Sequence, residues 1–291
     1  MEKFKEMEAR YLNPLTDFGF HKIFGTESNK NLLIDFLNQI IKEEGLITDI
    51  QYLTSEQWGS FETDRKAVFD IFCTTEKGAY FIVEMQKAKQ AFFRDRSIYY
   101  ASLPIQKQAP KGIWNFRLSA VYMVAILDFV LFDEFEDDKE QVIEHVRLMR
   151  EKTKTSYSDK LKFAFVELPK FRKTEEELET HFDKWLYLLK NLPELKARPV
   201  SVQDKVFEEL FELAEIKRLT ESDMETYRKS VLEYHDVISA MGCARDEGRE
   251  EGIGIGIEKV IQKCLQKNMA IEDIVFLTGY SKEQIIRHKL I

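Results

Sequence analysis

One apolar run constrains the fold more than any other feature of this sequence. Residues 119–129 (SAVYMVAILDF) are almost all apolar, and the run has the length of a strand rather than of a membrane span. Such a strand is typical of the centre of a sheet that is buried on both faces. The run therefore predicts an α/β protein with a sheet flanked by helices.

Four further segments have strand character. Two of them, 67–74 (AVFDIFCT) and 79–86 (AYFIVEMQ), are apolar, β-branched and aromatic, and only a short turn separates them. Segments 142–149 and 161–168 alternate or run apolar as strands do. The chain is therefore expected to form a mixed sheet with a hairpin near its start.

Helical patterns fill most of the remaining chain. The stretch 32–41 has one apolar stripe and is expected to end at Gly45, and a second helix is expected over 88–106. Thr174 and Glu177 form a capping box at the start of a helical half. Helices then follow at 206–219, 221–241, 271–277 and 282–288.

This order of elements predicts three regions. The α/β core covers 1–172, a helical extension covers 173–241, and a charged linker helix with a small helical module covers 242–291. The GIGIG stretch at 252–256 is not expected to bind phosphate, because no Lys-Ser/Thr follows it and no strand precedes it. The last two helices resemble a helix-turn-helix in length, but a small packing or dimerising module is favoured.

Charge and cysteine content exclude several classes of protein. The 291 residues carry a formal net charge of −8, which argues against non-specific coating of nucleic acid but allows a local basic groove. Cys73, Cys243 and Cys264 lie too far apart for a disulfide framework or a structural zinc site, and they suit a reducing compartment. No apolar run reaches ~18 residues and no secretory h-region is present, so we expect a cytoplasmic protein without a membrane partner.

Chemistry-bearing side chains gather on the expected hairpin. Its three-residue loop ends at Gly78, where this kind of turn needs a left-handed residue. With that turn, Asp70 lies directly opposite Glu84, with Cβ atoms ~5 Å apart. Gln86 shares the face of Glu84, because side chains alternate along a strand.

Two opposed carboxylates repel each other unless a proton or a cation lies between them. Their oxygen atoms suit a hard divalent cation, so Asp70 and Glu84 are candidate ligands for Mg²⁺, and the backbone carbonyl of Met85 is a third. A cation at this place would activate water and offset the charge of a phosphodiester, and Mn²⁺ is expected to substitute for Mg²⁺. The residues alone leave open a solvated hairpin face on which the acids have no role.

Several stretches together resemble a known family. The Asp…Glu-x-Gln pattern on two neighbouring strands resembles the PD-(D/E)xK nuclease core, and most of the chain resembles the Rpn-type recombination-promoting nuclease and transposase family. The resemblance rests on NPLTDFGFHKIFG at 13–25, NKNLLIDFLNQII at 29–41, FDIFCTTEKGAYFIVEMQ at 69–86 and FFRDRSIYYAS at 92–102.

The resemblance implies roles for individual residues. Asp70 and Glu84 match the metal-binding acids of the nuclease core, and Gln86 stands where the wider superfamily has lysine. Glutamine cannot supply a positive charge or act as a base, so its implied role is to orient the attacking water. Asp17 is assigned either to the lining of this site or to the cap of the short helix after it, and the cap is favoured.

The family implies cleavage of DNA with little sequence specificity, and recombination or transposition as a consequence. Four basic residues that follow the hairpin, Lys87, Lys89, Arg94 and Arg96, are expected to contact DNA phosphates, with a solvated helix face as the alternative. The competing hypothesis is a nuclease-fold protein with weak or no turnover that binds DNA or protein. Homodimerisation through the C-terminal helices is a further expectation.

Overall fold

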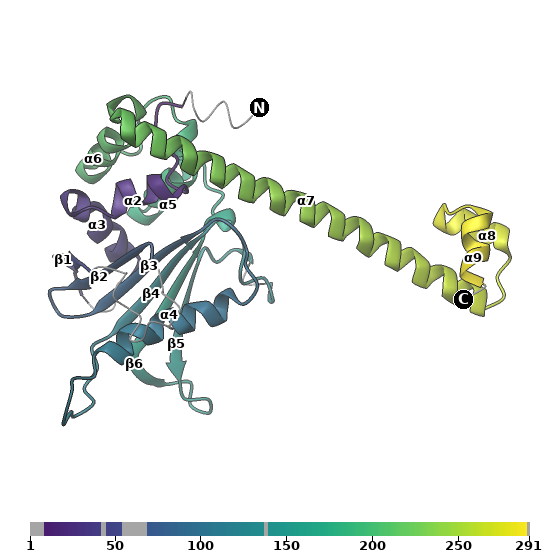
Figure 1. Cartoon of the computed structure of the whole chain (residues 1–291), viewed down its shortest axis with the longest axis horizontal. Coiled ribbons are helices and arrows are strands. Elements are labelled where there is room, and N and C mark those ends of the chain that lie inside the picture. Colours follow the sequence, from purple (N-terminus) through teal and green to yellow (C-terminus); the bar gives the residue numbers. More distant parts are fainter. Residues whose placement is uncertain (1–8, 42–44, 54–68, 137–138, 290–291) are drawn as a thin grey trace. The chain divides into compact units, whose positions relative to one another are not determined.

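A computed structural model describes residues 9–41, 45–53, 69–136 and 139–289, in two compact units, Met1–Asp236 and Val237–Ile291. Within the described residues, the first unit contains a six-stranded sheet in the order β1-β2-β3-β4-β6-β5 (Figure 1). Its strands are β1 Ile50–Tyr52, β2 Ile71–Thr75, β3 Tyr80–Gln86, β4 Val121–Leu127, β5 Ile143–Met149 and β6 Ser156–Glu167.

The sheet is mixed, as the sequence predicts. Strands β3, β4 and β6 run parallel, whereas β1, β2 and β5 pair antiparallel with their neighbours. All seven residues of β4 are buried, so the run at 119–129 is the central strand that its composition indicated. The expected strands at 79–86 and 142–149 are confirmed, β6 begins earlier than expected, and β1 was not predicted. Ala67 and Val68, the start of the expected strand 67–74, lie outside the described residues.

Helices cover both faces of this sheet (Figure 1). The α-helices of the first unit are α2 Asp17–Phe24, α3 Lys30–Ile40, α4 Phe93–Lys107, α5 His181–Asn191, α6 Lys205–Ala214 and the start of α7 Glu221–Gln266. Short 3-10 turns lie at Glu27–Asn29, Leu168–Lys170, Glu175–Glu177, Leu192–Glu194 and Ile216–Arg218. One hydrophobic core joins the sheet to α2, α3, α5 and α6, and a second joins the other face to α4.

The larger core brings together segments that are far apart in the sequence. Trp185 of α5 is completely buried, and its ring lies 5.6 Å from that of Phe24 and 5.5 Å from that of Phe36. The helices after residue 173 therefore share their core with the N-terminal helices. The boundary between an α/β core and a helical extension at residue 172 stays a prediction.

Two helix ends differ from expectation. Helix α3 ends at Ile40 and not at Gly45, because Ile41 already leaves the helical backbone conformation with ψ at 84°. The capping box at Thr174 is present, and the Thr174 N–H donates to the Glu177 carboxylate over 2.8 Å. It begins only a short 3-10 turn, and a second box at Thr180 and Asp183 begins α5.

The second unit continues α7 and adds α8 Ile271–Thr278 and α9 Lys282–Lys289. The expected end of a helix at Met241 is wrong, because the glycines that follow remain in α7. Each costs only about 1 kcal/mol relative to alanine, which is too little to break a helix alone. The expected turn at Gly279 is confirmed, with φ at +72°, and Ile261, Ile274 and Ile285 form a small core. None of the described helices is both long and apolar enough to span a membrane.

Candidate active site

The β2–β3 hairpin has the register that its turn predicted. Gly78 has φ at +80°, the left-handed conformation, and Ile71 pairs with Val83 across the two strands. One step beyond this pair, Asp70 faces Glu84. The three-residue turn therefore determines which acids meet, because a shift by one residue would put them on opposite faces.

Backbone and side-chain hydrogen bonds cross between the two acids. The Asp70 N–H donates to Glu84 Oε1 over 3.2 Å, and the Met85 N–H donates to Asp70 Oδ2 over 2.7 Å. Gln86 Nε2 donates to Glu84 Oε2 over 3.2 Å. The Glu84 side chain is only 3% exposed, whereas Asp70, which directly precedes β2, is exposed to solvent. The three predicted residues therefore meet in one patch with an open side.

This patch lies on the face of the sheet that α4 covers. Ile82 packs in the α4 core, and strand alternation places Glu84 and Gln86 on the same face. The Met85 side chain packs in the opposite core, so only its backbone is available to the patch.

Loss of surrounding water raises the pKa of both carboxyl groups, and a neighbouring carboxylate raises each further. Burial, followed by the charge of Asp70, raises the pKa of Glu84 to about 8. Loss of surrounding water raises the pKa of Asp70 to about 6, while the Met85 N–H and the charges of Lys87 and Arg96 act in the opposite direction. The pair therefore retains a proton near neutral pH, and a cation is the alternative way to relieve the repulsion.

Arg96 of α4 supplies positive charge to this pair, and its charge lowers the pKa of both acids. Its guanidinium lies over the rings of Phe93, at 5.0 Å, and Tyr100, at 5.6 Å. Its Nε and Nη2 atoms are buried, and the described residues offer them no hydrogen-bond partner. Two N–H groups of the Arg96 guanidinium are thus available to hydrogen-bond a bound molecule.

Sequence reasoning assigned Arg96 to DNA phosphate but missed that its charge acts on both acids. Its spacing from Phe93 and Tyr100, three and four residues, places all three on one helix face. This spacing in the sequence indicates that Arg96 lies between two aromatic side chains. It does not reveal that the face lies over the hairpin, where Tyr100 packs edge-on against Phe69, the neighbour of Asp70.

Asp17 does not cap α2 as expected. Thr16 does, because its side chain accepts a hydrogen bond from the Gly19 N–H over 3.1 Å. Asp17 begins the helix, and its carboxylate lies 2.7 Å from Nζ of Lys87, whose side chain is 12% exposed. The charge of Asp17 raises the pKa of Asp70. That Asp17 lines the site stays a prediction.

The other predicted phosphate contacts have different surroundings. Arg94 forms an ion pair with Glu134, donates to the Leu131 carbonyl over 3.0 Å and lies over the Phe132 ring. Lys89 is exposed. The four basic residues are therefore not equivalent, since Arg94 and Lys87 already have anionic partners.

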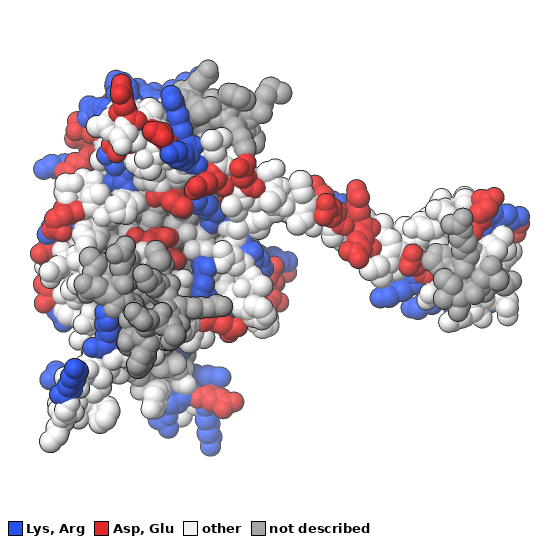
Figure 2. Space-filling model, in the orientation of Figure 1, with Lys and Arg blue, Asp and Glu red and all other residues white. Residues whose placement is uncertain are grey.

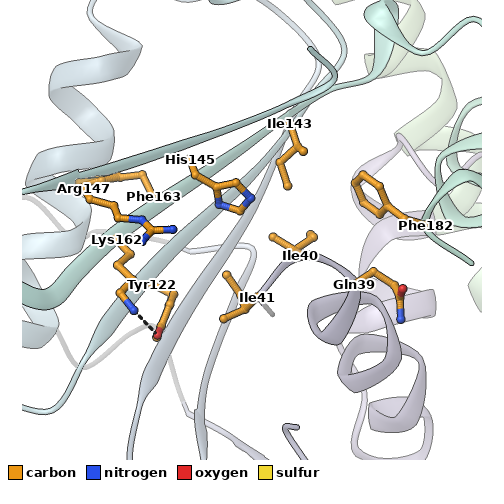
Figure 3. A pocket seen from close by; sticks show the side chains of 10 residues that line it. All are labelled: Gln39, Ile40, Ile41, Tyr122, Ile143, His145, Arg147, Lys162, Phe163 and Phe182. Carbon is orange, nitrogen blue, oxygen red and sulfur yellow. Dashed lines mark hydrogen bonds between the residues drawn. The ribbon is translucent and has the colours of Figure 1, made fainter. Parts of the chain in front are cut away.

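A cavity of about 270 Å³ lies at the other face of the sheet (Figure 3). It is lined by Gln39, Ile40, Ile41, Tyr122, Ile143, His145, Arg147, Lys162, Phe163 and Phe182. Lys162 Nζ donates to the Tyr122 hydroxyl over 3.2 Å. This lining contains no carboxylate, so it lacks the anionic oxygen ligands that favour a hard cation. Among the described residues, no three His, Cys, Asp or Glu side chains gather as metal ligands.

Comparison with known proteins gives one result. Residues 14–244 match the sequence model of the family described as PD-(D/E)XK nuclease family transposase. The matched range contains the hairpin, α4 and the helices that share the larger core. No curated protein and no solved structure gives a significant match to the chain.

Proposed function

The chain belongs to the PD-(D/E)XK nuclease family transposases, and from this membership we propose that it is a divalent-metal-dependent endonuclease that hydrolyses DNA. Family membership supports nuclease-like chemistry on nucleic acid. The observation that carries the finer proposal is that buried Glu84 faces exposed Asp70, and that each carboxylate accepts a hydrogen bond from backbone of the opposite strand. Mg²⁺ is the proposed cofactor, with Mn²⁺ as its substitute.

The donor set fits a hard cation. Asp70 and Glu84 supply carboxylate oxygens that repel each other at close range. In a strand, the N–H and C=O of one residue point toward the same neighbour, and the Met85 N–H already reaches Asp70. The Met85 carbonyl therefore faces the same side. These three groups would hold the cation, and such oxygen ligands match what Mg²⁺ takes.

Each side chain has a proposed task in hydrolysis. When bound, a divalent cation lowers the pKa of a water molecule and offsets phosphodiester charge. Gln86 positions the attacking water through its amide, whose Nε2 is already oriented by the Glu84 carboxylate. Asp17 holds Lys87 near the carboxylates by their ion pair.

Arg96 replaces the charge that Gln86 lacks. Its unpartnered Nε and Nη2 are suited to an oxygen of the scissile phosphate, because a guanidinium binds phosphate through paired donors. The aromatic rings on either side hold it in place before the substrate arrives. Exposed Lys89 contacts a flanking phosphate, and Arg94 is a third such contact once it leaves Glu134.

The proposal includes the wider setting of the reaction. Contacts to phosphate carry no sequence information, so little sequence specificity is expected. Promotion of recombination or transposition would follow from the breaks. The three cysteines are free thiols, which suits the proposed cytoplasmic location.

The direct test uses Asp70→Ala and Glu84→Ala with supercoiled plasmid DNA. Both variants are expected to lose Mg²⁺-dependent nicking by at least about 10³-fold, because the cation loses a carboxylate ligand. Asp159→Ala, which removes an exposed carboxylate elsewhere, is the matched control and should cut as the parent does. Thermal unfolding checks that all variants fold. Nicking at the parental rate by both site variants would refute the assignment.

One observation, the glutamine at position 86, favours a non-catalytic function. Gln86 lacks the charge and proton chemistry of lysine, so the fold is compatible with a DNA- or protein-binding module. Titration of Mg²⁺ and Mn²⁺ against the parent protein separates the two functions. DNA binding that needs no metal, together with no cleavage at any metal concentration, would favour the binding module.

A further inference from the structure

The segment 108–120, which joins α4 to β4, carries exposed aromatic and aliphatic side chains. We call it the α4–β4 loop. Ile113 is fully exposed, Phe116 is 78% exposed, and Trp114 is half-buried. The rings of Trp114 and Phe116 lie 5.0 Å apart at 37°. An apolar tip of this kind is costly in water unless something covers it.

The base of the loop is firmly held. The Gln108 side chain donates to the Ser119 carbonyl over 3.3 Å and accepts from the Ser119 N–H over 2.6 Å. Phe116 has φ at +58°, a conformation that bulky residues rarely adopt and that costs free energy. Strain of this kind gathers at binding sites, where the side chain must point in one particular direction.

The loop is also acid-free and basic in an otherwise acidic chain. No Asp or Glu occurs from Arg96 through Leu127, although the whole chain has a net charge of −8. Lys107, Lys111 and Arg117 lie in or beside the loop. At the lower left of Figure 2, where Figure 1 places this loop, the projecting tip is white and blue.

A similar feature recurs at the other end of α4. Phe92 immediately precedes the helix, is 79% exposed and has φ at +61°. Exposed Lys89 lies beside it in the sequence. Helix α4 has 15 residues, which corresponds to a length of about 22 Å. Exposed, strained phenylalanines with basic neighbours thus mark both ends of the helix that covers the candidate active site.

We propose that the α4–β4 loop is a second nucleic-acid contact, which stacks unpaired bases of the substrate on Trp114 and Phe116. The inference rests on the proposed function, because it deepens the choice of substrate. Lys111 and Arg117 bind the phosphates of the same strand. The enzyme then engages DNA that is partly single-stranded, at a distance of roughly one α4 length from Asp70 and Glu84.

Unpaired bases fit this surface better than duplex DNA does. Aromatic rings stack on the face of any base, but in a duplex both faces are covered by neighbouring base pairs. Basic residues without acids match a phosphate backbone. Basic–aromatic surfaces that track a single strand have this composition.

The test measures binding without cleavage. The full chain carrying Asp70→Ala is titrated in EDTA against a fluorescent oligo(dT) and against a blunt duplex of equal length, by anisotropy. Adding Trp114→Ala and Phe116→Ala should weaken oligo(dT) binding by about tenfold for each lost stack and leave duplex binding almost unchanged. Lys111→Ala with Arg117→Ala should lower the salt dependence by about 0.7 per removed charge.

Two further variants distinguish a lost binding contact from a misfolded protein. Phe116→Gly removes the ring and relieves the strained φ, so it should raise the thermal midpoint while it weakens oligo(dT) binding. Phe276→Ala removes an aromatic ring that is 88% exposed on α8, and it should bind oligo(dT) as the Asp70→Ala parent does.

Three outcomes would overturn the inference. These are unchanged oligo(dT) binding by the loop variants, a parental dimer that the loop variants convert to monomers, and anionic-vesicle binding that depends on the loop while oligo(dT) binding does not. None of these concerns cleavage. A failed stacking contact is therefore distinguishable from a failed nuclease assignment, which the plasmid experiment tests.

Discussion

At the residue scale, the main departure from the superfamily pattern is an uncharged Gln86 in a site that still has a cation close by. Arg96 comes from a different element and is clamped by Phe93 and Tyr100. A charge supplied from the helix leaves Gln86 free to hydrogen-bond Glu84. The proposed catalytic set is thus distributed over the hairpin and α4.

The role of Arg96 leads to the first prediction. Arg96→Met keeps an aliphatic chain between the two rings but removes the charge, so kcat for plasmid nicking should fall by about 10²-fold with little change in KM. Arg96→Lys should recover part of the loss. Steady-state nicking assays measure both parameters, and Lys229→Met, which removes an exposed cation on α7, is the control. A rise in KM alone would show that Arg96 only binds DNA.

The pKa of Glu84 leads to a second prediction. Because folding raises this pKa to about 8, the metal-free fold is most stable when Glu84 is protonated and loses stability as the pH rises through that value. Glu84→Gln should therefore be more stable than the parent at pH 9, by more than about 1.4 kcal/mol, the equivalent of one pKa unit. Urea unfolding in EDTA from pH 6 to pH 9 measures this. Parallel curves for both proteins would contradict it.

At the element scale, the hairpin turn controls the site because its geometry sets the register. Gly78 adopts φ at +80°, and an added Cβ would have only Ser119 Oγ nearby, at 3.7 Å. Space is therefore sufficient, and only the backbone conformation disfavours a side chain. The two acids meet because of this conformation.

Gly78→Ala should consequently destabilise the protein by about 1–2 kcal/mol, the cost of the left-handed conformation for a residue with Cβ. Urea unfolding measures the change. Gly252→Ala, within helix α7 and with open space around it, is the opposite-sign control and should stabilise that helix by about 1 kcal/mol. Equal stability of Gly78→Ala and the parent would show that the turn tolerates a side chain.

At the scale of the whole molecule, the candidate site and the small C-terminal core belong to different units of the chain. Every site residue lies in Met1–Asp236, and the small core of Ile261, Ile274 and Ile285 lies in Val237–Ile291. Tyr227 and Val231 of α7 still pack in the larger core, and Tyr234 donates to Asp128 over 2.8 Å. The beginning of α7 therefore belongs structurally to the first unit.

A chain that ends at Met241 should keep the nuclease unit intact. Its thermal midpoint should stay within about 3 °C of that of the full chain, a change of about 1 kcal/mol or less. Mg²⁺-dependent nicking per molecule should also remain. Sedimentation of both chains then tests the proposed homodimer, which requires the C-terminal helices. Loss of folding in the shorter chain would show that the two units depend on each other.

The sequence alone determined the features that depend on local pattern. The run at 119–129 predicted the central strand, and the loop ending at Gly78 predicted the pairing of Asp70 with Glu84. Both predictions follow from short-range rules, since burial sets composition and turn length sets register.

Only the tertiary structure decided which distant residues join those acids. Arg96 reaches them because α4 packs over their face of the sheet, and Asp17 reaches Lys87 from a helix at the start of the chain. No local pattern encodes such contacts, because they depend on how helices pack onto the sheet. The same packing raised the pKa of Glu84, since burial is a property of the assembled fold and not of the strand.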